Sequence, residues 1–270
     1  MNFRPQILTI LAVFAAAAPR PALAWGPKVH RIVCTAAWDE ISEANRDRAR
    51  EILNITAREQ FAAHCVRPDD LINKSPDTAA WHVMNVARGE STVDLERDCP
   101  MPASCVVREI ERNIGILESE ASKDEKASAL AFLGHLVADV HQPLNMGLAE
   151  DRGGEKTTAI FLGQSTTMRA IWDDHLLAAV PEPTAPNGIL RIYGFLFRVG
   201  ARSNSWTETR PLGWAQQSLW VMRTPATGYL GNPGGLAFDE IYVKQNELTA
   251  LEQVDKAAVR LAHVLRDLLK

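Results

Sequence analysis

The chain has 270 residues and a mass of 29.8 kDa, and 46% of its residues are hydrophobic and 23% charged. This composition excludes intrinsic disorder and collagen-like repeats, and the length allows one sizeable core. The first 24 residues hold Arg4, Arg20 and no acid, so the remainder has 27 basic and 33 acidic residues, a balance of -6. A broadly basic surface for nucleic acid is therefore excluded. An anionic substrate would need local positive charge, such as bound metal cations.

The first 24 residues have the pattern of a secretory signal. Arg4 precedes an almost uninterrupted apolar run from Ile7 to Ala18, and a short segment rich in proline and alanine follows. This pattern predicts cleavage after Ala24 and a secreted or periplasmic location, with an uncleaved interfacial anchor as the alternative. The apolar run is shorter than the roughly 20 residues that a membrane span needs. Cleavage would make Trp25 the first residue, with a free α-amine able to bind a metal.

Four cysteines in an exported chain predict two disulfides, although the sequence alone permits three pairings. Cys99 and Cys105 flank a turn-rich stretch and could close a small loop, which would leave Cys34 to pair with Cys65. A cysteine zinc site is the alternative, but the chain contains no Cys-x-x-Cys pair.

Helical spacing of apolar residues dominates the chain after residue 24. The clearest case is the apolar stripe between Leu251 and Leu268. Rougher helical patterns cover residues 29–41, 47–57, 106–120, 128–140 and 216–222. One short β-ribbon is expected at residues 157–162, after the turn-forming run 151–154. Because no linker divides residues 25–270, we predict an all-α fold in a single, mostly helical domain.

The segment before Pro143 carries the most informative side chains. His135 and Asp139 lie four residues apart, which places an imidazole and a carboxylate on one face of an otherwise apolar helix. Metal ligation would explain this pair, and a core histidine hydrogen-bonded to its own helix is the alternative. Pro143 should end the helix. His141 lies on a different face and is expected to be a structural hydrogen-bonding residue.

Two further segments supply side chains of the ligand type. His30 lies five residues after Trp25, and Asp69 and His82 add a carboxylate and an imidazole. Each is weak evidence alone, because surface and capping uses of such residues are common. As a set with the α-amine, they are nitrogen and oxygen ligands of the kind that zinc accepts.

The order of these motifs along the chain carries a family resemblance. The matching segments are residues 25–26 with His30, then 68–71, 81–85, 133–144, 151–154, 171–173, 214–218 and 260–262. The run from Leu133 to Leu144, with its His-x-x-x-Asp-x-His-Gln-Pro core, is highly specific. The chain thus resembles the zinc-dependent type I nucleases, the S1/P1 family of single-strand nucleases, which is distantly similar to bacterial zinc phospholipase C. Similarity extends over nearly all of the chain after residue 24.

The resemblance implies a mostly helical fold with a cluster of three zinc ions in a cleft. The family hydrolyses phosphodiester and 3′-phosphomonoester bonds and leaves 5′-phosphates. By position, the first zinc would be held by Asp69, His82, His135 and Asp139. The second would be held by Trp25, His30 and again Asp139, which makes Asp139 the bridge.

The resemblance also implies catalytic roles. Two neighbouring zincs can share a water, lower its pKa and direct it at phosphorus. Asn85 falls where the family has a residue that orients this water, so Asp69, Asn85 and Asp139 are the expected catalytic residues. The family pairing joins Cys34 to Cys65.

The chain departs from the family at the third zinc. Asn145 stands in place of a histidine and Arg169 in place of the next ligand, so only Asp173 of that set remains. A guanidinium cannot lose its proton to bind a metal, and an amide oxygen is a poor zinc ligand. Two zincs are therefore expected, with Arg169 paired to Asp173 at a degraded third site. The chain departs from the family at two more positions. Val83 stands in place of an aromatic residue that stacks on a base, and Ile72 stands in place of an arginine.

These features predict an exported zinc-dependent phosphodiesterase that cuts single-stranded DNA or RNA, with no transmembrane segment and no protein partner implied. Two alternatives stay open. Loss of the stacking aromatic favours a phosphoesterase acting on lipid head groups or small esters, and the degraded third site favours a non-catalytic relative.

Overall fold

The computed structural model describes residues 24–197, 206, 208–230 and 236–270, so residues 1–23 of the expected signal lie outside the described residues. The α-helices are α1 (Pro27–Glu40), α2 (Glu43–Leu53), α3 (Arg58–His64), α4 (Arg67–Ile72), α5 (Leu95–Asp98), α6 (Val106–Glu118), α7 (Lys123–Asp139), α8 (Met168–Ala170), α9 (Gly188–Phe197), α10 (Pro211–Arg223) and α11 (Glu240–Leu268). Short 3₁₀ turns are η1 (Pro76–His82), η2 (Pro143–Met146), η3 (Ala149–Asp151) and η6 (Pro225–Thr227), and η4 (Ile171–His175) is a π-helix. The expected mostly helical fold is confirmed.

Polar residues at the helix starts fix where the main helices begin. The Ser122 side chain accepts from the Glu125 N–H, and the Glu125 carboxylate accepts from the Ser122 N–H, which forms a capping box ahead of α7. Pro27 opens α1, where its missing N–H has no helical partner to lose. Asp239 caps α11 by accepting from two backbone N–H groups. As a result α2 and α7 begin earlier in the chain than their apolar patterns predict.

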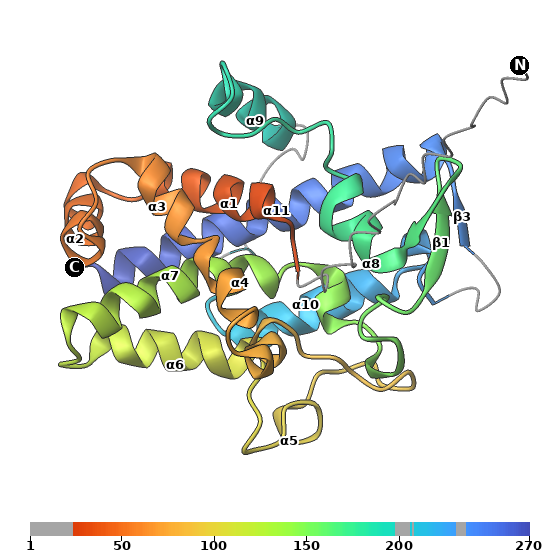
Figure 1. Ribbon diagram of the computed structural model, residues 1–270, viewed down its shortest axis with the longest axis horizontal. Coiled ribbons are helices and arrows are strands. Elements are labelled where there is room, and N and C mark those ends of the chain that lie inside the picture. The colour runs from red at the N-terminus through yellow and green to blue at the C-terminus, as the bar shows by residue number, and fades with distance from the viewer. Residues whose placement is uncertain (1–23, 198–205, 207, 231–235) are drawn as a thin grey trace, which may run out of the picture.

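Helix α7 lies at the centre of the helical layer. It packs against α1, α6 and α11, and α1 packs along α11 (Figure 1). Within α7 every residue from Ala129 to Asp139 is buried except Phe132. The segment that carries His135 and Asp139 therefore runs through the core. In the part of the chain that the structure describes, no helix is both long and apolar enough to cross a membrane.

A small sheet packs beside the helices, in the order β2-β1-β3. Strand β1 (Thr158–Phe161) pairs antiparallel with β2 (Gln164–Thr167), with Phe161 opposite Gln164, and the chain turns through Leu162 and Gly163, both with positive φ. This is the expected ribbon, extended toward the second strand. Strand β3 (Leu236–Phe238), which the sequence patterns do not indicate, pairs parallel with β1.

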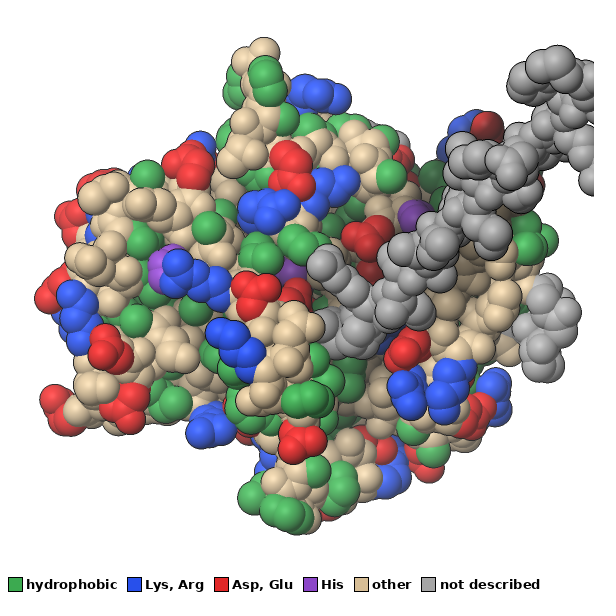
Figure 2. All heavy atoms as spheres, viewed as in Figure 1, with side chains coloured by type: hydrophobic (Ala, Val, Ile, Leu, Met, Phe, Trp, Pro, Cys, Tyr) green, Lys and Arg blue, Asp and Glu red, His purple; other side chains and the backbone are tan. Residues whose placement is uncertain are grey.

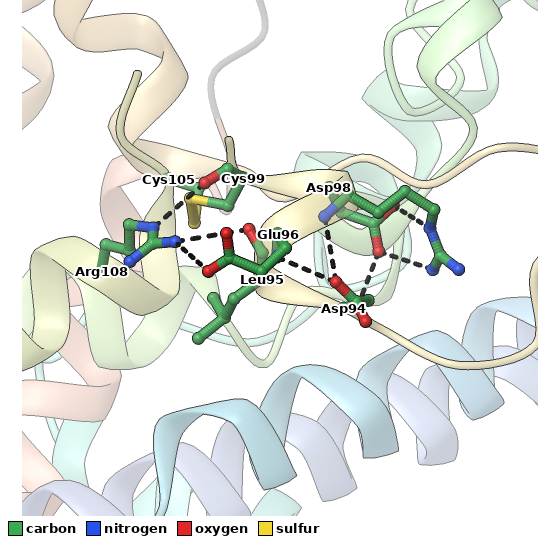
Figure 3. The surroundings of a disulfide bond; sticks show 8 residues. Asp94, Leu95, Glu96, Asp98, Cys99, Cys105 and Arg108 are labelled. Atoms are coloured by element: carbon green, nitrogen blue, oxygen red, sulfur yellow. Dashed lines mark hydrogen bonds and ion pairs between the residues drawn. A yellow bond between two sulfur atoms is a disulfide. The ribbon is translucent and has the colours of Figure 1, made fainter. Parts of the chain in front are cut away.

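Two disulfides are present, Cys34–Cys65 and Cys99–Cys105. The first ties α1 to the residue after α3 and packs against α7 at Gly134, where a Cβ would lie 2.6 Å from the Cys65 sulfur. The second closes a short loop after α5. Arg108 braces this loop, since its Nε donates to the Cys99 carbonyl at 3.0 Å and its Nη2 pairs with Glu96 at 3.4 Å (Figure 3).

Acidic and basic side chains are interspersed over the face drawn in Figure 2. This distribution agrees with the mildly acidic charge balance, and it directs attention to local charges rather than to an extended basic surface.

Candidate metal centre

Five ligand-type side chains from four elements converge in the core. His30 comes from α1, Asp69 from α4, His82 from the last residue of η1, and His135 and Asp139 from α7. The three imidazoles and the Asp139 carboxylate are fully buried, and the Asp69 side chain is 20% exposed. Burial of so many polar groups together is costly unless they are paired or bind a metal.

The two carboxylate oxygens of Asp139 face different histidines. Oδ1 lies 3.4 Å from His30 Nε2, whereas Oδ2 lies 2.8 Å from His82 Nδ1 and 3.0 Å from His135 Nε2. Asp69 Oδ1 lies 3.4 Å from His135 Nε2 and 3.8 Å from His82 Nδ1. Asp139 thus contacts His30 through one oxygen and His82 and His135 through the other, which is the arrangement of a bridging ligand.

Donor atoms without partners test whether the cluster suits a metal. Both ring nitrogens of His30, Nε2 of His82, Oδ1 of Asp69 and Oδ1 of Asp139 are buried and find no hydrogen-bond partner among the described residues. Buried polar atoms are nearly always satisfied in folded proteins. His30 Nε2 and Asp139 Oδ1 lie 3.4 Å apart without a hydrogen bond, and such nitrogen and carboxylate oxygen atoms are ligands that a zinc ion accepts.

Two overlapping triads have donor atoms close enough to hold an ion. One consists of His30, Asp69 and His135, and the other of His82, His135 and Asp139. His135 is the member that both share, and the rings of His30 and His135 stack with centroids 3.8 Å apart. These triads consist of side chains alone, so the expected grouping of His30 with the amine and carbonyl of Trp25 stays a prediction. The cluster as a whole contains the same five side chains.

The orientation of His135 is set from outside the cluster. Its Nδ1–H donates to the Cys65 carbonyl at 2.8 Å, which fixes the tautomer and leaves Nε2 as the ligand atom. No sequence pattern indicates this contact, because it depends on the disulfide that brings Cys65 beside α7.

The charges in the cluster depend on each other. Burial would lower the pKa of His135, but Asp139 and Asp69 outweigh it and raise that pKa well above its ordinary value. Burial and the neighbouring His135 lower the pKa of His30 to about 4. Burial would raise the pKa of Asp139, yet His135 and the hydrogen bond from His82 hold it well below its usual range. A metal bound at His135 Nε2 would compete with a proton for that nitrogen.

His141 lies outside the cluster, as expected. Its Nδ1–H donates to the Val137 carbonyl at 2.7 Å, and its Nε2 accepts from Arg260 Nη1 at 2.7 Å. Both ring nitrogens are thus used in structural hydrogen bonds, and this histidine has no free lone pair for a metal.

Trp25 and Gly26 lie against the segment that follows α8. The Trp25 side chain is buried, and the Gly26 N–H donates to the Asp173 carbonyl at 3.1 Å. A Cβ at Gly26 would lie 2.0 Å from an Asp174 side-chain oxygen, so a larger residue there would displace that exposed carboxylate. This contact fixes the position of the chain at Trp25.

Arg169 occupies the degraded third position and pairs with Asp173. Its Nε donates to Asp173 Oδ2 at 3.2 Å, its Nη1 to the Leu144 carbonyl at 3.3 Å, and its Nη2 to the Asn145 side-chain oxygen. The expected ion pair is confirmed, and all three nitrogens of this guanidinium are used within the protein. Burial raises the pKa of Asp173 to about 7, against the opposing charge of Arg169.

Further hydrogen bonds join this pair to the metal centre. The Asn145 amide donates to the Asp139 carbonyl at 2.7 Å, and the Asn85 amide donates to the Asn145 carbonyl at 3.4 Å. Gln142 Nε2 donates to Asp173 Oδ1 at 2.5 Å. Gln142 lies in the matching segment 133–144, but the sequence does not indicate a role for it. The turn from α7 into η2 brings its side chain to Asp173.

Comparisons with known proteins agree on one family. A family model for the S1/P1 nuclease matches residues 25–270. Endonuclease 3 of Arabidopsis thaliana is 31% identical over 170 residues, 60% of this chain and 57% of that protein. Endonuclease 1 of the same organism is 22% identical over 96% of this chain and 92% of its own length. Nuclease S1 of Aspergillus oryzae is 25% identical over 63% of this chain and 64% of its own length.

The chain therefore spans less than two thirds of Endonuclease 3 and nuclease S1 and nearly all of Endonuclease 1. The family match begins at Trp25, runs to Lys270 and includes every residue of the cluster. The resemblance seen in the sequence is confirmed, and the chain belongs to the S1/P1 nuclease family.

Proposed function

We propose that this chain is an exported, metal-dependent endonuclease that hydrolyses phosphodiester bonds of single-stranded nucleic acid and leaves 5′-phosphates. The observation that carries the proposal is the convergence of three buried imidazoles on the two oxygens of Asp139, with His30 Nε2 and Asp139 Oδ1 left without hydrogen-bond partners among the described residues. Membership of a nuclease family supports it, as do relatives named endonuclease or nuclease.

Zinc is the ion that the donor set fits best, because three imidazoles and two carboxylates are its preferred nitrogen and oxygen ligands. The residues proposed to hold two zincs are Trp25, His30, Asp69, His82, His135 and Asp139. Zinc bound there supplies Lewis acidity toward a phosphate oxygen and lowers the pKa of a water. Arg169 is used within the protein at the remaining position, so a third ion is not part of the proposal.

The protein's own groups then have distinct tasks. Asp139 offsets positive charge on both sides of the cluster, since each oxygen faces different imidazoles. Asp69 is the member nearest to solvent and lies where substrate would enter. Asn85 is half-buried and hydrogen-bonded to the segment that carries Asn145, so its amide is held in place to orient a water. Arg169 keeps Asp173 and Asn145 fixed behind the cluster.

Export is proposed from two independent features. Disulfides persist in oxidising compartments, and both cysteine pairs are bonded. The first 24 residues have the pattern of a cleavable signal.

The test uses protein that begins at Trp25, assayed on single-stranded DNA, single-stranded RNA and phosphatidylcholine vesicles. We expect cleavage of the nucleic acids, loss of activity in a chelator and recovery when zinc is restored. Asp139→Asn should abolish cleavage. The matched control is Asp124→Asn, an exposed aspartate in the first turn of the same helix, which should cleave at the parent rate.

Hydrolysis of the phospholipid alone would replace the proposal with the lipid phosphoesterase alternative. Zinc binding without hydrolysis of any substrate would identify a non-catalytic relative.

A further inference from the structure

A surface cavity of about 340 Å³ lies between α4 and α7, the two helices that also supply Asp69, His135 and Asp139 (Figure 1). Its lining includes the apolar side chains of Pro68, Leu71, Ala131 and Phe132, with His64 and Arg67 at the side. The volume is within the range of small-ligand sites.

The cavity and the metal centre are built on the same two helices. Pro68 precedes Asp69 in α4, and Ala131 precedes His135 by one helical turn in α7. At 1.5 Å of rise per residue this turn spans about 6 Å. A strand bound at the metal centre would therefore have the cavity within reach of a neighbouring nucleotide.

Aromatic surface lines one side of the cavity. Phe132 is the only residue of α7 between Ala129 and Asp139 that is not fully buried, and its ring packs on Trp81 with centroids 5.9 Å apart. Arg112 lies over the Trp81 ring at 6.0 Å, which holds the indole in place behind Phe132. A fixed, partly exposed ring suits a flat apolar group.

The charge of the cavity favours an anion. Arg67 is exposed, and its Nη1 donates to His64 Nδ1 at 3.2 Å. Burial and the neighbouring Arg67 lower the pKa of His64, and the Arg67 guanidinium carries the positive charge of the cavity. No acidic side chain is among the described residues that line the cavity. An aromatic wall with one guanidinium matches a nucleobase with its phosphate.

We infer that this cavity is a nucleotide subsite, in which one base of a single strand packs on Phe132 and its phosphate pairs with Arg67. The inference rests on the proposed function, because it places a nucleotide adjoining the one cut at the metal centre. It also gives the chain a place for a base, although Val83 stands where the family has its stacking aromatic.

Two substitutions test the subsite. Ser128 is exposed at the cavity, so Ser128→Trp should fill it, and Arg67→Ala should remove its charge. The matched controls, Ala44→Trp and Arg48→Ala, lie exposed on α2. Binding of a labelled single-stranded oligonucleotide is measured by fluorescence anisotropy in chelator, where no cleavage occurs. Each subsite variant should weaken binding about five-fold or more, and the controls should match the parent.

Kinetics supply a second readout. With zinc present, the subsite variants should raise KM for the oligonucleotide more than KM for bis(4-nitrophenyl) phosphate, a diester without a base. Circular dichroism melts establish that each variant is folded.

Parent-like oligonucleotide affinity in both subsite variants would overturn the inference. So would slower hydrolysis of phospholipid vesicles with unchanged oligonucleotide binding, which would identify a lipid site. A parent protein that cleaves no phosphodiester would instead overturn the proposed function, and the anisotropy result would still decide the subsite.

Discussion

Asp139 is the residue at which the imidazoles of the cluster meet, with His30 at one oxygen and His82 and His135 at the other. Its two oxygens contact all three imidazoles, and no single histidine contacts Asp139 through both oxygens. Replacing Asp139 should therefore affect metal binding more than replacing any single histidine.

We expect Asp139→Asn to lower bound zinc by more than one ion per chain, from the two of the parent, because an amide cannot bridge two cations. His30→Asn should lose about one ion at most. Elemental analysis of dialysed protein measures both. Loss of only one ion from Asp139→Asn, with cleavage retained, would show that Asp139 is not the bridge.

The burial of Arg169 and its hydrogen bonds to Asp173 and Asn145 indicate a structural role for this residue. The guanidinium is 2% exposed, and its loss would leave the Asp173 carboxylate and the Asn145 oxygen without their partner. We expect Arg169→Met to lower the free energy of unfolding by about 3 kcal/mol. Urea unfolding at pH 8, above the pKa of about 7 that Asp173 has in the parent, measures this change.

The double variant Arg169→Met with Asp173→Asn serves as the control, because it removes the buried charge along with its partner. It should recover much of the lost stability. Equal stability of Arg169→Met and the parent would contradict the role assigned to the ion pair.

At the scale of the element, α7 depends on a glycine in its interior. A Cβ on Gly134 would lie 2.6 Å from the Cys65 sulfur and 3.0 Å from the Cys34 sulfur. The disulfide can thus press against the helix only because no side chain intervenes.

We expect Gly134→Ala to destabilise the protein by about 2 kcal/mol, through overpacking against the disulfide. The control is Gly115→Ala in α6, where a Cβ meets nothing within 4 Å. That change should stabilise the protein by about 0.5 to 1 kcal/mol, because alanine favours the helix. Thermal melts followed by circular dichroism compare the two, and a Gly134→Ala variant as stable as the parent would refute the packing argument.

Helix identity was predictable from apolar spacing, but helix ends were not. The pattern over residues 47–57 gives the buried face of α2, which runs from Glu43 to Leu53. Its first turn is polar and starts from the cap at Ser42, and Asn54 ends it in the left-handed conformation. Apolar periodicity carries no information about either cap.

The sequence patterns do not predict the elements that depend on contacts between distant parts of the chain. Helix α4 and turn η1 are short and lack a clear period, although they carry Asp69 and His82. Strand β3 has three residues and pairs with β1 from far along the chain. Such segments take their structure from tertiary packing rather than from local preference.

In the candidate site, too, some features were predictable from the sequence and others depend on the folded structure. Its ligand residues were identified because their types and order match a family pattern. Their orienting partners were not, because the Cys65 carbonyl and the Gln142 amide reach the site only in the folded chain.

At the scale of the whole molecule, the three tyrosines tie separate elements together. The contacts of their hydroxyl groups are Tyr193 with Asp39, Tyr229 with Asp151, and Tyr242 with the Thr227 carbonyl. Burial is the main cause that raises the pKa of each phenol above its ordinary value.

This predicts a specific loss of stability in alkali. A folded-state pKa raised above the unfolded value of about 10 gives stability that is present below pH 10 and lost as pH rises further. Absorbance of tyrosinate near 295 nm should therefore appear together with unfolding, as one transition. Tyr229→Phe should shift unfolding to higher pH, and gradual ionisation in the folded protein would contradict the prediction.

Cys65 takes part both in a disulfide and in the positioning of a histidine of the candidate metal centre. Its sulfur bonds to Cys34, while its carbonyl holds the ring of His135. A reduced chain would lack the covalent tie that keeps this carbonyl beside α7. Under the proposed function, the protein would hold its metal ligands in place only in an oxidising compartment, where the disulfide persists.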